Sequence, residues 1–147
     1  MADHVRKQLR EAVATLVTSL TTTGVNVFQS RSYPLQITEL PCLIVTTDGD
    51  QVDNITMNHP AQQQRETRVR IDAYARATAS LDDTLDLICK EVEIAIAGAS
   101  TTLVKGLMYN GCQVDIEVLG DQPVGKASMV FSKDLYTVSN APDVLIG

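Results

Sequence analysis

Arg68-Val69-Arg70-Ile71-Asp72-Ala73-Tyr74-Ala75-Arg76-Ala77 alternates polar and apolar side chains without interruption. One side of this segment carries only aliphatic residues, and the other carries three arginines, an aspartate and a tyrosine. A period of two with a single apolar face predicts a half-buried strand of an antiparallel sheet.

A helix is predicted directly after the strand. Ser80 is placed as its N-cap, and Asp82 and Asp83 fall in the first turn, where the helix dipole favours negative charge. Gly98 is expected to end it. The apolar stripe of this helix consists of Leu81, Leu85, Ile88, Val92 and Ile96.

Towards the N-terminus, the apolar spacing predicts a first helix over about residues 3–20, ended by Gly24 in a left-handed cap. A short strand at 25–28 and a second at 43–47 follow, and residues 48–50 are expected to form a turn. The polar segment at about 51–64 is predicted to be a long exposed loop or an irregular hairpin arm.

Two further strands are predicted after the second helix, over 113–119 and 126–138. In the first of these, Val114, Ile116 and Val118 are expected to point inward, because they alternate with acidic residues. The resulting order of elements predicts an α+β fold, with a mostly antiparallel sheet of about four to five strands and two helices packed on one face. Residues 1–138 are expected to form this single domain, and 139–147 a C-terminal extension that is either flexible or a docking arm.

Composition narrows the classes of function. The formal net charge is -6 over 147 residues, which disfavours a dedicated nucleic-acid binder. No apolar run is long enough to cross a bilayer, and no secretory signal is recognised, so a soluble protein made in a cytoplasm and without membrane contact is expected. Cys42, Cys89 and Cys112 lie in apolar or alternating segments, which predicts buried thiols.

Motifs for chemistry are not found. The acidic run that begins at Asp48 has Asp53 where a calcium loop needs glycine, and His59 where it needs glutamate. His4 and His59 have no second ligand at metal spacing. No nucleophile motif or phosphate-binding loop is recognised. We therefore predict no catalytic residues, no cofactor and no metal.

The polar face of the strand at 68–77 is the most suggestive surface. Arg68, Arg70, Tyr74 and Arg76 lie on it, and arginine and tyrosine are enriched at protein interfaces. A solvated strand face, a subunit contact and a nucleic-acid platform all remain open. The predicted interface also includes Asp50, Asp53 and His59, which belong to or adjoin the polar segment.

Several stretches carry a family resemblance. Residues 24–35 read GVNVFQSRSYPL, and Glu39-Leu40-Pro41-Cys42-Leu43-Ile44-Val45 follows a few residues later. With the amphipathic helix before them, these stretches resemble the opening of the tail terminator (minor tail) proteins of long-tailed bacteriophages. Ala75-Arg76-Ala77-Thr78 and Tyr136-Thr137 also fit the pattern of that family, whereas the ten residues after Thr137 depart from it.

The resemblance implies a function. Members of the family form rings, usually hexameric, that bind the last ring of the major tail tube protein, stop further polymerisation and present a surface to neck or head-completion proteins. DNA passes through the lumen without specific binding. The implied location is the head-proximal end of the virion tail, reached after assembly in the host cytoplasm.

Two other classes of function remain open. A neck or head-tail connector protein of the same virion would share most of these features and differ in its binding partner. A small enzyme or ligand-binding α+β domain would require a concave pocket with convergent polar groups.

Overall fold

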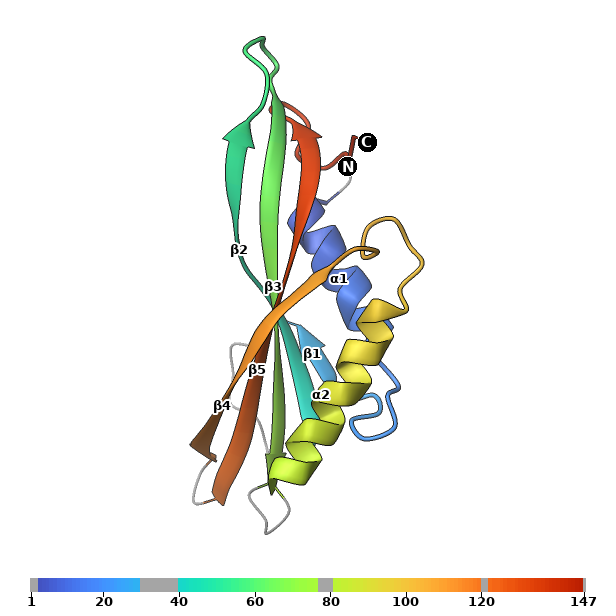
Figure 1. The fold of residues 1–147 in the computed structure, drawn as a ribbon, viewed down its shortest axis with the longest axis vertical. Coiled ribbons are helices and arrows are strands. Elements are labelled where there is room, and N and C mark those ends of the chain that lie inside the picture. Colours follow the sequence, from blue (N-terminus) through green and yellow to red (C-terminus); the bar gives the residue numbers. More distant parts are fainter. Residues whose placement is uncertain (1–2, 30–39, 77–80, 120–121, 147) are drawn as a thin grey trace.

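The structure is a computed structural model that describes residues 3–29, 40–76, 81–119 and 122–146, although the side chains of 117–119 and 122 are not described. Its elements are α1 (Val5–Leu16), β1 (Val27–Gln29), β2 (Cys42–Asn54), β3 (Gln62–Arg76), α2 (Leu81–Ala97), β4 (Met108–Leu119) and β5 (Gln122–Val138). The N- and C-terminal ends of the described chain lie close together (Figure 1).

The five strands form one sheet in the order β1-β2-β3-β5-β4. β1 runs parallel to β2, and the other neighbours are antiparallel. α1 packs mainly on β1 and β2, and α2 on β3 and β5, so both helices lie on the same side of the sheet (Figure 1). The predicted α+β fold with a mostly antiparallel sheet and two helices on one face is confirmed.

The core lies between the helices and the sheet. The apolar residues of β3 are buried as predicted, with Val69 and Ile71 fully inaccessible to solvent. Leu85, Ile88, Val92 and Ile96 of α2 are buried against them, while Leu81 is partly buried. Phe131 of β5 is the largest fully buried side chain of the described residues. Sheet alternation and helix periodicity therefore point to the same core.

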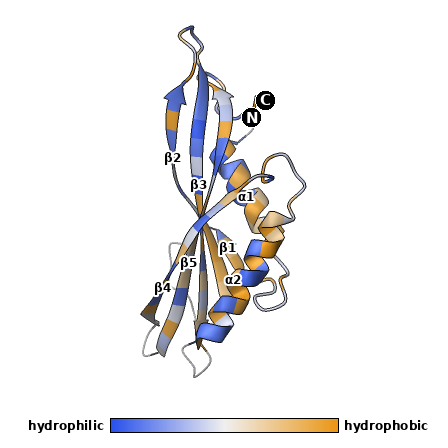
Figure 2. Ribbon diagram, viewed as in Figure 1, coloured by the Kyte–Doolittle hydropathy of each residue, from blue (hydrophilic) through white to orange (hydrophobic). Residues whose placement is uncertain are grey.

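β2, β3 and the end of β5 continue past the helices as a projection (Figure 1), in which residues 55–61 join β2 to β3 and β5 pairs with β3 as far as Val138. We call residues 48–68, with 133–138 of β5, the arm. Its strands β2 and β3 are mainly hydrophilic where they leave the helices (Figure 2). The pairing extends to Asn54 and Gln63, so the segment at 51–64 is a hairpin and not a long loop.

The predicted turn at 48–50 is wrong. β2 runs through these residues and accommodates an irregularity between Thr47 and Gly49, where the register with β3 shifts. Gly49 has a φ of +115°, which a residue with a side chain rarely adopts. A glycine inside a strand can thus mark a bulge as well as a turn.

The N-terminal boundaries also differ from the prediction. α1 ends at Leu16, four residues earlier than expected, because Ser19 takes a positive φ of 70° and redirects the chain. Gly24 has the expected left-handed φ of +57°, but it closes a turn onto Leu20 instead of capping α1. The predicted N-cap Ser80 lies outside the described residues.

The last two strands begin earlier than predicted, at Met108 and Gln122. Val114 and Ile116 are 54% and 71% exposed, which corrects the expectation that they are buried. They lie on the helix side of β4, but α2 covers β3 and β5 and leaves this edge strand uncovered. The side chain of Val118 is not among those described.

The cysteines differ from one another. Cys42 is buried as expected, Cys89 is half-buried, and Cys112 on β4 is exposed. The prediction of a buried thiol is therefore wrong for Cys112. Like Val114 and Ile116, this residue lies on β4, which α2 does not cover. Alternation reports the face of a strand, and a second layer decides its burial.

The C-terminal segment 139–146 lies against the arm and α1. The backbone N–H of Val5 donates to the carbonyl of Pro142 at 3.0 Å, and that of Ile146 donates to Tyr136 at 2.9 Å. Leu145 packs against the core. A role of this segment in docking to another protein stays a prediction.

His4 caps α1 through a side-chain nitrogen. The Nδ1 atom accepts a hydrogen bond from the backbone N–H of Arg6 at 3.1 Å, which requires an unprotonated nitrogen. Burial, followed by the charges of Arg6 and Arg65, lowers the pKa of His4 below its ordinary value of 6.5.

This cap predicts acid-sensitive fraying of α1. Since the folded-state pKa lies below the unfolded one, the cap's contribution to stability is full above pH 6.5 and is lost as the pH falls through the folded pKa. The protection factors of the Arg6 and Lys7 amides, which correct for the slower intrinsic exchange in acid, should therefore fall on acidification, and much less so in His4→Asn, whose amide caps at any pH. A His4 pKa at or above 6.5 by NMR would contradict this.

Candidate interaction surfaces

The open face of β3, opposite the helices, carries the arginines predicted from sequence. Arg68, Arg70, Tyr74 and Arg76 share this face because they alternate with the buried residues of β3. Arg68 Nε lies 3.8 Å from Glu66 Oε1, and Arg70 Nη1 lies 3.6 Å from Asp48 Oδ1. The face thus carries mixed charge and is not a row of free guanidinium groups.

Asp72 lies at the centre of this face. Its Oδ2 atom is 3.3 Å from Arg70 Nε, and its side chain is only 5% exposed. The Oδ1 atom has no hydrogen-bond partner among the described residues. Lys126 Nζ lies 5.8 Å from the ring centroid of the neighbouring Tyr74, within the range of a cation–π contact.

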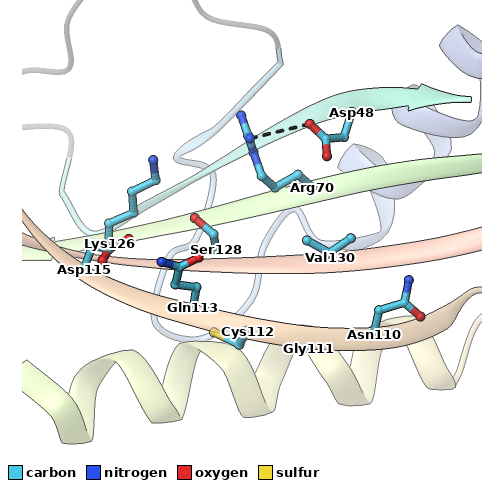
Figure 3. Close-up of a pocket in the computed structure, with 10 residues that line it drawn as sticks. All are labelled: Asp48, Arg70, Asn110, Gly111, Cys112, Gln113, Asp115, Lys126, Ser128 and Val130. Atoms are coloured by element: carbon cyan, nitrogen blue, oxygen red, sulfur yellow. Dashed lines mark ion pairs between the residues drawn. The ribbon is translucent and has the colours of Figure 1, made fainter.

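A shallow polar hollow of about 520 Å³ opens on the same side of the sheet (Figure 3). Asp48 and Arg70 line one end, and Asp115 and Lys126 the other. Gln113 and Ser128 lie between them (Figure 3). The two acidic and two basic side chains balance one another, which favours contact with a polar protein surface over capture of a single charged ligand.

Asp50 faces the opposite side of the sheet from Arg68 and is largely buried. Its Oδ2 atom lies 2.9 Å from Arg65 Nη1, and its Oδ1 atom lies 3.2 Å from Arg6 Nη1. Arg65 Nε also donates to the hydroxyl of Thr137 at 2.9 Å. Asp50 therefore ties β2 to β3 and α1, and through Arg65 to β5.

Asp53 and His59 lie on the arm, away from the open face of β3 at Arg70. Asp53 is paired in register with Gln64 near the end of β2, and His59 lies in the connection between the strands. Exposed apolar side chains accompany them at the tip: Met57 is 100% exposed and Ile55 is 49% exposed. The seven predicted interface residues thus fall on at least three separate surfaces.

A groove of about 380 Å³ between α2 and β4 was not predicted from sequence. Asp86, Cys89 and Glu93 of α2 line one wall, and Tyr109 and Val114 are on the β4 wall. Burial raises the pKa of the Cys89 thiol well above its ordinary value, as does a hydrogen bond with Cys112. Burial also raises the pKa of Tyr109 to about 12, so these groups stay protonated at neutral pH.

No family model matches the chain, and no curated protein matches it. Among solved structures, the chain is similar to one from the "Virion of native gene transfer agent (GTA) particle", with 18% identity and a TM-score of 0.44. The likeness covers 91% of this chain and 92% of that chain.

The edge strand opposite β4 is β1, which lies beneath α1. Arg10 Nε donates to the side-chain oxygen of Gln29 on β1 at 3.3 Å. Arg6, one helical turn earlier, is 42% exposed while it pairs with Asp50. Val25, just before β1, is 77% exposed. This edge is basic, whereas the groove on the other side of the molecule is acidic.

Neither a metal-binding cluster nor a membrane-spanning helix is found among the described residues. Within 3–29, 40–76, 81–119 and 122–146, no group of three or more histidine, cysteine, aspartate or glutamate side chains is arranged to hold a metal ion. Over the same ranges, no helix has the length and apolar character that spanning a membrane requires.

Some sequence signals could have located the groove. Asp82, Asp86, Cys89 and Glu93 recur at helical spacing on one flank of α2, beside the apolar stripe. Acidic residues on one flank of a helix indicate that this flank meets solvent or a charged partner. The position of β4 beside that flank depends on the strand order, which the sequence does not reveal.

Proposed function

We propose that this chain is a structural protein of a phage-like virion that caps the tail tube as a ring and ends tube polymerisation. The resemblance of residues 24–45, 75–78 and 136–137 to tail terminators supports this proposal. The α+β fold with two helices on one face is compatible with it. In this proposal the chain has no enzymatic role, and its partners are further copies of itself, the major tail tube protein and a neck protein.

The arm is the observation that carries the proposal. It extends the central strands beyond both helices (Figure 1) and ends in exposed apolar side chains, Met57 at 100% and Ile55 at 49%. An exposed apolar group on a polar projection is suited to insertion into a partner. We assign the tip of the arm, residues 55–61, to contact with the last ring of the tube, and the open face of β3 with Arg68, Arg70, Tyr74 and Arg76 to the neck side.

A test of the whole proposal compares solution mass with and without tube protein from the same virion. The expected result is a ring, alone or on tube ends, together with tubes that stop growing. A ring that ignores the tube and binds the connector would favour a neck protein instead. A monomer indifferent to both would contradict the proposal.

Met57→Asp should separate capping from assembly. The side chain contributes nothing to the core, so the fold and the ring should persist, whereas the charge should prevent insertion into an apolar site on the tube. Tube length by electron microscopy should then exceed the capped length, and Met57→Leu, which retains apolar bulk, should cap normally. Equal capping by Met57→Asp and the wild type would exclude the arm tip as the tube contact.

A further inference from the structure

We propose that copies of this chain join through opposite ends of the sheet, with the acidic β4–α2 groove of one copy receiving the basic α1–β1 edge of the next. The inference rests on the proposed ring and names the surfaces that close it. We call Asp82, Asp86 and Glu93 with the exposed apolar residues of β4 the acidic edge. Arg6 and Arg10 with Val25 form the basic edge.

The acidic edge has the charge and the apolar surface of an unpartnered interface. None of the described ion pairs includes Asp82, Asp86 or Glu93. Within the described residues, β4 pairs only with β5, so its other side is an open strand edge. Ile116 and Val114 add apolar area there, at 71% and 54% exposure. Natural proteins rarely leave such an edge uncovered.

The basic edge offers the complementary chemistry. Arg10 forms no ion pair with any described residue and is held only by the amide oxygen of Gln29. The side chain of Arg6 is 42% exposed although it pairs with Asp50. Arginine in a partly desolvated contact can bind a carboxylate through two parallel hydrogen bonds. Val25, which comes just before β1, adds exposed apolar surface to this edge.

The placement of the two edges suits a ring. β1 and β4 are the first and last strands of the sheet, so the surfaces next to them lie at opposite ends of the strand order. Two different patches on opposite sides of one subunit form a heterologous contact, which closes into a ring when the rotation allows it. A two-fold dimer through the acidic edge alone would instead place like charges together.

The basic edge of a second copy fits the acidic edge better than the open face of β3 or a nucleic acid does. The arginines on the open face of β3 that have described partners, Arg68 and Arg70, are paired within their own chain. The guanidinium of Arg10 has no such carboxylate among the described residues. A nucleic acid would be repelled by Asp82, Asp86 and Glu93.

Charge reversal tests the contact directly. Glu93→Lys and Arg10→Glu should each weaken self-association by about tenfold or more, because each places like charges together. The double variant Glu93→Lys/Arg10→Glu should regain assembly, since every contact then again joins opposite charges. An equimolar mixture of the two single variants should also assemble, with the two kinds of copy alternating. Lys105→Glu reverses a charge at an exposed residue outside both edges, the arm and the open face, so it is the matched control and should assemble normally.

Mass photometry or light scattering in the presence of tube protein reports assembly, and circular dichroism confirms folding. Cys112 gives an independent readout because it lines the groove and is exposed, whereas Cys42 is buried and Cys89 half-buried. Its reaction with a maleimide should be at least about tenfold slower in the assembled wild type than in the dissociated protein.

The outcomes separate the contact from the proposed function. Normal assembly of both folded single variants, failure of the double variant and the mixture to recover, or unchanged Cys112 labelling would each overturn the contact while leaving a ring in place. A wild-type chain that never self-associates, with or without tube protein, would overturn the contact and the proposed function together.

Discussion

Asp50→Ala is expected to lower the free energy of unfolding by about 3–5 kcal/mol, which is the scale for removing one partner of a buried ion pair. The carboxylate is 9% exposed and lies 2.9 Å from Arg65 Nη1, whose own side chain is 11% exposed. Without Asp50, the guanidinium of Arg65 remains largely buried, and its partners among the described residues are then only the neutral Thr137 and Gln63. Most of the cost therefore comes from the unpaired charge that is left behind.

Urea unfolding of Asp50→Ala and of Asp48→Ala makes the comparison. Asp48 lies two residues earlier on the same strand, and its pair with Arg70 is exposed, with side chains 42% and 39% accessible. Its removal should cost about 0–1 kcal/mol. A thermal midpoint roughly 10 °C lower is expected for Asp50→Ala only. Equal losses from the two variants would show that burial of the Arg65 network does not govern the stability of the arm.

Phe131→Ala is the second large effect, at about 3–5 kcal/mol for truncating a buried phenylalanine. Phe131 is 1% exposed, and its ring stacks on Tyr109 of β4 with 5.1 Å between centroids. The substitution leaves a cavity under the helices and also removes the aromatic contact between β5 and the edge strand. Phe131→Leu fills most of the volume and should cost less, under about 1.5 kcal/mol.

Calorimetry measures the loss of stability, and amide exchange along β4 tests the local part of the argument. Phe131→Ala should increase exchange near Tyr109 by more than the global destabilisation explains, because β4 pairs only with β5 among the described residues. A uniform increase over all strands would contradict a specific role of the ring stack in holding this edge.

Local periodicity predicted the elements that have a covered face. β3, α2 and most of α1 carry a complete apolar stripe, and the fold class follows from their order. In the arm, β2 and β3 have no such stripe, because they are mainly polar and are held by pairing with each other and, for β3, with β5. The sequence therefore did not predict how far β2 extends. Gly49 forms a bulge inside β2, but in the sequence it resembles part of a turn.

The interaction surfaces were predictable only in part. The face shared by Arg68, Arg70, Tyr74 and Arg76 follows from alternation, but the carboxylates that pair with Arg68 and Arg70 do not. Asp50 meets Arg6 across 44 residues of sequence, a contact that depends on where α1 packs. The exposure of Val114 and Ile116 depends on which strands α2 covers. Contacts between layers of the fold are not encoded in any local pattern.

The long pairing of β3 with β5 has a mechanical consequence. The two strands stay in continuous antiparallel register from Gln62 and Val138 at one end to Arg76 and Val124 at the other. β3 runs along the longest axis of the molecule (Figure 1). Tension applied between the arm tip and the opposite end would load this ladder in shear, so that its hydrogen bonds resist together instead of peeling apart one after another. The centre of the sheet would act as a stiff rod, and extension under force should begin at the edge strands.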